Sequence, residues 1–126
     1  MRKIIKLLLL ILFFSIQINA QQTDLVKAVA LFSNEKYSAS QALFHQLIID
    51  NRTNEMANYY NAKCSKELFA SDAIFLYEQF LLSFPYTSFS QQVNEDLALL
   101  YYRDLDYHKA VKYFLQFNSL EQHPDL

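Results

Sequence analysis

The sequence predicts an all-α fold, and three observations lead to it. The 126 residues include no glycine, which removes the usual residue for tight turns between strands. Apolar side chains recur at three- and four-residue steps, the spacing that places them on one face of a helix. Short polar clusters, at residues 34–36 and 50–52 for example, divide the chain into helix-length stretches. A chain of this length forms at most one domain.

The first twenty residues have the layout of a secretory signal peptide. Arg2, Lys3 and Lys6 form a basic head, residues 7–16 are almost entirely apolar, and a more polar exit ends at Ala20. We expect cleavage near Ala20, which places the remaining chain outside the cytoplasm. The alternative is an uncleaved leader that anchors the protein in the inner membrane. Its apolar run is shorter than the roughly 20 residues of a spanning helix, which favours cleavage.

Six helices are expected after the leader, over residues 21–34, 37–50, 53–68, 71–84, 86–104 and 106–118. Thr53 and Ser71 are the expected N-caps of the third and fourth helices, because their hydroxyls can accept from free backbone N–H groups. Pro85 ends the fourth helix, since the residue before a proline is pushed out of helical geometry. The remaining residues, 119–126, are expected to be a frayed tail or the start of a continuation.

Polar side chains begin the last two helices as well. Ser88 and Gln91 have the spacing of a capping box at the fifth helix. Asp104 or Asp106 can cap the sixth. The adjacent carboxylates of Glu95 and Asp96 are expected on the solvated surface, because neighbours in a helix point to different sides.

A small residue followed four positions later by an aromatic one opens each second helix. These pairs are Ser40 and Phe44, Ala73 and Tyr77, and Ala110 and Phe114. The small residues lie 33 and 37 positions apart. This pattern resembles the tetratricopeptide repeat, a helix hairpin of about 34 residues. The resemblance covers residues 24–118 and rests on Ser40, Phe44, Ala73, Tyr77, Pro85, Ala98, Tyr107, Ala110 and Phe114.

The resemblance implies an α-solenoid of about three stacked antiparallel hairpins, over residues 21–50, 53–84 and 86–118. It also implies a concave groove, lined by the first helix of each hairpin, that binds a peptide or a partner protein. The candidate groove residues are Asn58, Tyr60, Asn61, Lys63, Asn94 and Tyr101. For the tyrosines the alternative is a place in the core, and for the polar residues a plain solvated face.

Composition argues against several other functions. Cleavage would remove three of the eleven basic residues and none of the thirteen acidic ones, and a mildly acidic domain is poorly suited to nucleic acid. The lack of glycine excludes Gly-rich phosphate loops. His45, His108 and His123 lie far apart with no second ligand at metal spacing, and the single Cys64 has no partner for an intramolecular disulfide. We expect no cofactor, no metal and no enzymatic activity.

The last helix is apolar across a broad face, although terminal repeats usually have a polar outer face. We expect that the chain is the front of a longer array, that this helix docks on a partner, or that the protein self-associates through it. The resemblance to tetratricopeptide repeat proteins implies a protein-interaction scaffold of the bacterial cell envelope, in the periplasm. The alternatives are an N-terminal accessory or dimerisation domain of a larger envelope enzyme or sensor, and a membrane-anchored repeat protein.

Overall fold

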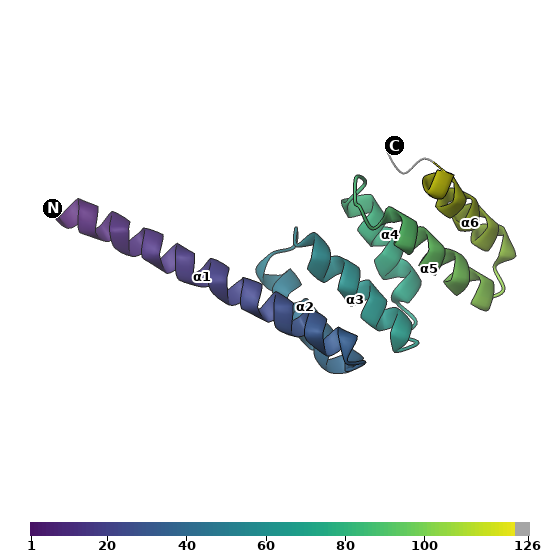
Figure 1. The fold of residues 1–126 in the computed structure, drawn as a ribbon, viewed down its shortest axis with the longest axis horizontal. Coiled ribbons are helices and arrows are strands. Elements are labelled where there is room, and N and C mark those ends of the chain that lie inside the picture. The colour runs from purple at the N-terminus through teal and green to yellow at the C-terminus, as the bar shows by residue number, and fades with distance from the viewer. Residues whose placement is uncertain (123–126) are drawn as a thin grey trace.

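The computed structural model describes the backbone of residues 1–122, and the side chains of all of these except 17, 18 and 120–122. Its helices are α1 (Arg2–Ser33), α2 (Tyr37–Asp50), α3 (Glu55–Glu67), α4 (Ala73–Ser83), α5 (Ser90–Arg103) and α6 (Tyr107–Gln122). No strand occurs in this described range, so the all-α prediction is confirmed. Each helix packs against the next along the chain, and α1 also contacts α3 (Figure 1).

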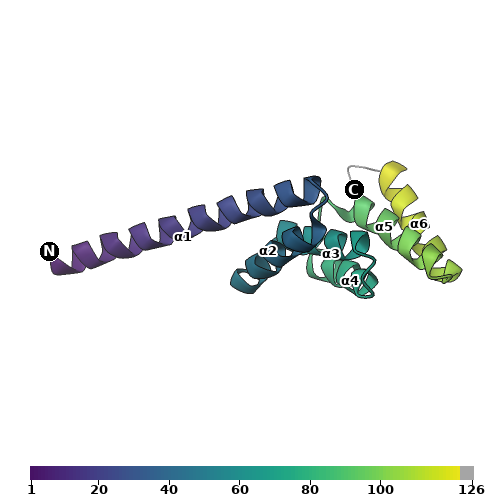
Figure 2. The ribbon, with the colours of Figure 1, turned by 90° about the horizontal axis from the view of Figure 1, so that it is seen from below.

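Helix α1 differs from expectation because it runs without a break from the leader into the first hairpin. Its N-terminal half extends away from the other helices (Figures 1 and 2). No glycine or proline interrupts these residues, so nothing local ends the helix between residues 2 and 33. By length and composition the apolar stretch could cross a membrane, which fits a signal sequence and an anchor equally.

Several helix ends are set by side chains other than the predicted ones. Asn54 caps α3 by accepting from the N–H of Ala57 at 3.0 Å, while Thr53 is bonded to the Asn51 side chain instead. Ser71 is exposed, and α4 starts after Asp72 without a side-chain cap. Asn54 thus replaces Thr53, and Ser71 has no capping role.

Helix α5 begins later than predicted and ends one residue earlier, whereas α6 both begins and ends later. Helix α5 begins at Ser90, because Thr87 forms a local turn in which its hydroxyl accepts from the N–H of Phe89 at 3.1 Å. Asp106 caps α6 by accepting from the N–H of Lys109 at 3.2 Å, as one of the two predicted alternatives. Helix α6 continues to Gln122, so residues 119–122 are helical rather than frayed. Residues 123–126 of the predicted tail lie outside the described residues.

Three turns with one geometry join the helices of each pair. Glu35, Phe69 and Leu105 have φ values of 59°, 53° and 64°, in the left-handed region. The residue after each donates its N–H to the carbonyl five positions earlier, at 2.9 Å in all three turns. This is the Schellman motif that ends many helices. The left-handed residues lie 34 and 36 positions apart and provide a common reference point for the three helix pairs. Below, two residues are called equivalent when each lies at the same sequence distance from the left-handed residue of its own turn.

This register identifies where the helices of each pair approach most closely. Ala28, Ala62 and Ala98 are equivalent, and all three are buried. The small residues of the second helices, among them Ser40 and Ala73, are buried as well. The Ser40 hydroxyl donates to the carbonyl of Ala28 at 2.7 Å, which directly joins α2 to α1. Small residues on both helices therefore allow α1 and α2 to approach closely.

The second turn accounts for part of the difference between the steps of 33 and 37 that separate the small residues. Ala73 lies four positions after its left-handed residue, whereas Ser40 and Ala110 lie five positions after theirs. The N–H of Ala73 bonds to the carbonyl of Ala70 at 3.4 Å, a tighter turn than the other two pairs use. The second turn is therefore one residue shorter.

Candidate partner-binding surfaces

Three of the six residues predicted to line a groove lie within the packed interior. Asn61, Asn94 and Tyr101 are only 5%, 5% and 6% exposed. The side-chain oxygens of Asn61 and Asn94 are buried without a hydrogen-bond partner. Tyr101 donates to the Glu78 carboxylate at 2.6 Å and stacks on Tyr113 with ring centroids 5.6 Å apart. Tyr101 therefore helps to join α5 to α4 and α6.

The other three predicted residues are half-buried. The amide of Asn58 donates to the backbone of its own helix start, at 2.8 Å to the carbonyl of Asn54. The Lys63 ammonium lies 5.6 Å from the ring centroid of Phe32. Tyr60 also contacts Phe32, so the structure brings Tyr60 and Lys63 together on one aromatic ring.

Tyr60 forms the contact between the first helix pair and α3. Its ring lies 5.1 Å from that of Phe32 on α1 and stacks at 5.4 Å on that of Phe44 on α2. Ser65 on α3 accepts from the amide of Gln41 on α2 at 2.8 Å. One aromatic side chain of α3 thus fills the groove between α1 and α2.

Asp96 forms the corresponding contact between the second helix pair and α5. Its position nine residues before Leu105 is equivalent to that of Tyr60 before Phe69. Asp96 was expected on the surface, but it is 8% exposed and accepts from Lys66 Nζ and from the Tyr77 hydroxyl, both at 2.6 Å. These two donors satisfy the carboxylate and make its burial tolerable.

The charge of Asp96 alters the titration of its partners. Burial alone would lower the pKa of Lys66, but the hydrogen bond and charge of Asp96 outweigh burial and raise that pKa. Burial, followed by the same carboxylate, raises the pKa of the Tyr77 phenol. Lys66 therefore stays charged, and Tyr77 stays a donor, across the neutral range.

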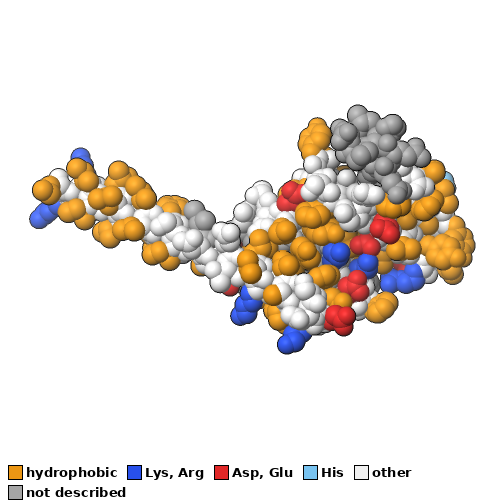
Figure 3. Space-filling model, in the orientation of Figure 1, with side chains coloured by type: hydrophobic (Ala, Val, Ile, Leu, Met, Phe, Trp, Pro, Cys, Tyr) orange, Lys and Arg blue, Asp and Glu red, His pale blue; other side chains and the backbone are white. Residues whose placement is uncertain are grey.

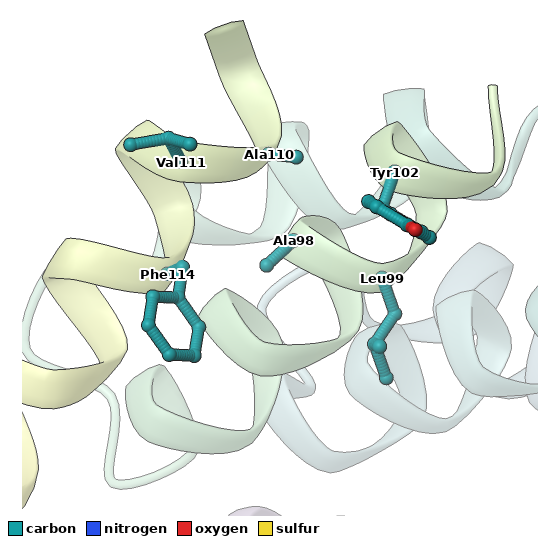
Figure 4. A pocket seen from close by; sticks show the side chains of 6 residues that line it. All are labelled: Ala98, Leu99, Tyr102, Ala110, Val111 and Phe114. Atoms are coloured by element: carbon teal, nitrogen blue, oxygen red, sulfur yellow. The ribbon is translucent and has the colours of Figure 1, made fainter. Parts of the chain in front are cut away.

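The third helix pair has the same groove, but no described helix covers it. This α5–α6 groove has a volume of about 220 Å³. It lies between the two helices (Figure 4) and is lined by Ala98, Leu99, Tyr102, Ala110, Val111 and Phe114.

Phe114 is the clearest sign that this groove is open. It is 53% exposed, whereas the aromatic residues four positions after the opening small residue in the first two pairs, Phe44 and Tyr77, are fully buried. Tyr113 rather than Phe114 packs in the interior, and no described helix lies over α6 where α3 and α5 lie over α2 and α4. Tyr107 is exposed as well, with its ring 5.5 Å from that of Tyr102.

A second depression lies between the C-terminal halves of α3 and α5. This α3–α5 cleft has a volume of about 180 Å³ and is lined by Lys66, Glu67, Phe69, Leu99, Leu100 and Arg103. The Arg103 guanidinium lies 5.9 Å from the ring centroid of Phe69, which is 79% exposed. Charged and apolar side chains alternate over this middle part of the molecule (Figure 3). The cleft therefore offers a cation and an aromatic ring side by side.

Except for Tyr101, the residues predicted to line a groove lie closer to the starts of α3 and α5 than the residues that line this cleft. The available signal was Phe69, a large aromatic residue in a turn between two helices. Among the residues that the structure describes, no three His, Cys, Asp or Glu side chains gather as a metal ion would require. Burial raises the pKa of the Cys64 thiol, although a hydrogen bond with Ser40 opposes this. Among known protein families, curated proteins and solved structures, none matches the chain.

Proposed function

We propose that the protein is a tetratricopeptide-like repeat scaffold that binds a partner protein outside the bacterial cytoplasm. The repeat assignment is supported by three Schellman turns, 34 and 36 residues apart, and by equivalent buried alanines on the first helix of each pair. A period near 34 is the length of a tetratricopeptide unit. Stacked helix pairs of this kind expose long surfaces that suit protein recognition.

The export part of the proposal is supported by the N-terminus. Three basic residues precede the apolar stretch of α1, and basic residues stay on the cytoplasmic side of a membrane. A cleaved signal peptide and an uncleaved anchor therefore place the helix pairs on the same, non-cytoplasmic side. We favour the cleaved form, in the periplasm.

The observation that supports partner binding most directly is the α3–α5 cleft. Its exposed Phe69 and Leu99 are large apolar side chains, and Arg103 adds a charge beside them. Aromatic residues and arginine are enriched where proteins bind one another. A peptide segment with an apolar side chain and a carboxylate would match these contacts.

Site-specific photo-crosslinking in cells tests this proposal. A photoreactive residue replaces Phe69 in the full chain, and a matched control replaces Ile49, which is similarly exposed on α2 outside the cleft. We expect a discrete adduct from position 69 that is lost when Arg103→Glu is added, and no such adduct from position 49. Equal labelling at both positions, or no adduct at 69, would contradict binding at the cleft.

A second candidate is an accessory or dimerisation domain of a larger envelope protein. The open α5–α6 groove favours it, because a surface of this kind is usually covered. An immunoblot of native cells with antibodies to this chain distinguishes the two. A single band no larger than expected for 126 residues, with or without the leader, would count against the second candidate, and a much larger band would favour it.

A further inference from the structure

The α5–α6 groove is an uncovered copy of an interface that occurs twice within the chain. Helix α3 covers the groove between α1 and α2, and α5 covers the groove between α3 and α4. Each of these two helices contributes three residues, which lie 12, 9 and 5 positions before the left-handed residue of the turn that follows the helix. On α3 and α5 the outer two of these are fully or almost fully buried, and the middle one enters the groove. These residues are Ala57, Tyr60 and Cys64 on α3, and Val93, Asp96 and Leu100 on α5.

Helix α1 carries the same three positions, but there no other described helix covers them. They are Thr23, Val26 and Ala30, and all are exposed, with Val26 65% exposed. No described helix pair precedes α1. The molecule therefore has the inserting face of the interface at one end and the receiving groove at the other.

We infer that α1 of one copy docks in the α5–α6 groove of a second copy. Val26 enters between Tyr102 and Phe114, as Tyr60 enters between Phe32 and Phe44 within the chain. Thr23 and Ala30 flank it, as the small residues Ala57 and Cys64 flank Tyr60. The contact is heterologous, because the two copies use different faces, and each added copy presents a further open groove.

The chemistry of the groove favours α1 over the other first helices. Tyr102 and Phe114 take the places that Phe32 and Phe44 take in the aromatic groove, and the six lining residues include no cation such as Lys66. A helix with a carboxylate in the middle position, as in α5, would lose hydration there without gaining a partner. The middle residue of α3 is already inserted in its own chain. Val26 is apolar and uncovered, so α1 is the helix that fits.

The inference does not depend on partner binding at the α3–α5 cleft. Its test uses the full chain, purified as the cells produce it, in a mild detergent that shields any leader still present. Val26→Asp removes the inserting face, Phe114→Asp removes the groove, and Ile49→Asp is a control at an exposed site outside both. Val111→Asp provides a second groove variant, and far-ultraviolet circular dichroism checks that each variant remains folded.

Sedimentation velocity over a range of concentrations gives the result. We expect the wild type and Ile49→Asp to associate into species that grow with concentration, and each face variant to associate at least about tenfold more weakly. A mixture of Val26→Asp with Phe114→Asp should form dimers and nothing larger, because each variant keeps the face that the other lacks.

Three outcomes would overturn the inference. The wild type could remain monomeric at all concentrations. The mixture of variants could fail to dimerise. Val26→Asp could associate as well as the wild type while Phe114→Asp does not, which would indicate that two α5–α6 grooves pair with each other instead.

Discussion

Replacing Lys66 by methionine should destabilise the protein more than replacing Lys66 and Asp96 together. Lys66 Nζ lies 2.6 Å from the Asp96 carboxylate, and the Asp96 side chain is only 11% exposed. Without the cation, this carboxylate stays buried with the Tyr77 hydroxyl as its remaining donor. The double variant Lys66→Met with Asp96→Leu removes both charges and leaves apolar side chains of similar size.

The size of the effect follows from the burial of the pair. At an effective dielectric constant of about 20, two unit charges at this distance attract by roughly 6 kcal/mol, much of which offsets their desolvation. Breaking a fully buried pair costs about 3–5 kcal/mol. The Lys66 side chain is 25% exposed, so water reaches the site and the cost is smaller. We expect Lys66→Met to lower the free energy of unfolding by about 2–3 kcal/mol. For a helical body of this size that corresponds to about 10–20 °C in melting temperature.

Thermal and urea unfolding followed by circular dichroism measure this difference, since the chain contains no tryptophan to report by fluorescence. The double variant should lose clearly less stability than Lys66→Met alone, because it leaves no unpaired buried charge. If the free energy of unfolding of Lys66→Met lies within about 0.5 kcal/mol of the wild-type value, the ion pair is solvated and does not hold α5 against α3 and α4.

Three further substitutions or conditions test the packing. Asn61→Leu should stabilise the protein by about 1–2 kcal/mol in urea unfolding, because the buried Asn61 oxygen has no donor and its equivalent is the buried Leu97; a loss of stability would show that Asn61 has a partner. Ala73→Leu should cost about 1–3 kcal/mol by thermal melting, since a larger side chain forces α4 from α3; an unchanged midpoint would contradict the close approach. Burial, with nearby acidic groups, raises the phenol pKa of Tyr59 and of Tyr113 from 10 to about 12. The unfolded chain therefore loses these protons first, so stability should fall as pH rises from about 10 to 12, with tyrosinate absorbance rising as helix is lost; tyrosinate formed near pH 10 in a chain that stays helical would contradict this.

The helices could be predicted from the sequence because their causes are local. Apolar spacing and polar turns define α2 to the residue, and Pro85 ends α4 as expected. The N-caps were predicted less well because adjacent polar residues compete. Thr53 and Asn54 are both suitable N-cap residues. In the structure the Thr53 hydroxyl is bonded to the Asn51 side chain, and Asn54 caps the helix instead.

The contacts between helix pairs could not be predicted from local patterns. A carboxylate is placed on the surface by default, and the burial of Asp96 depends on Lys66 and Tyr77, which lie 30 and 19 positions earlier in the chain. Phe114 occupies the position that the repeat pattern indicates, yet its exposure depends on a neighbouring helix. Which residues form an apolar face is a property of the segment, whereas what covers that face is a property of the assembly.

A chain without glycine must build its left-handed turns from residues that resist them. Glu35, Phe69 and Leu105 each hold a conformation that is about 1–2 kcal/mol less favourable for a residue with a Cβ atom. The three turns follow one another along one edge of the molecule (Figure 1), and two of them expose a large apolar side chain. The strained turns thus carry exposed apolar side chains at one end of the helices. A glycine at residue 69 or 105 would relieve the backbone strain of that turn, but it would also remove the exposed apolar side chain.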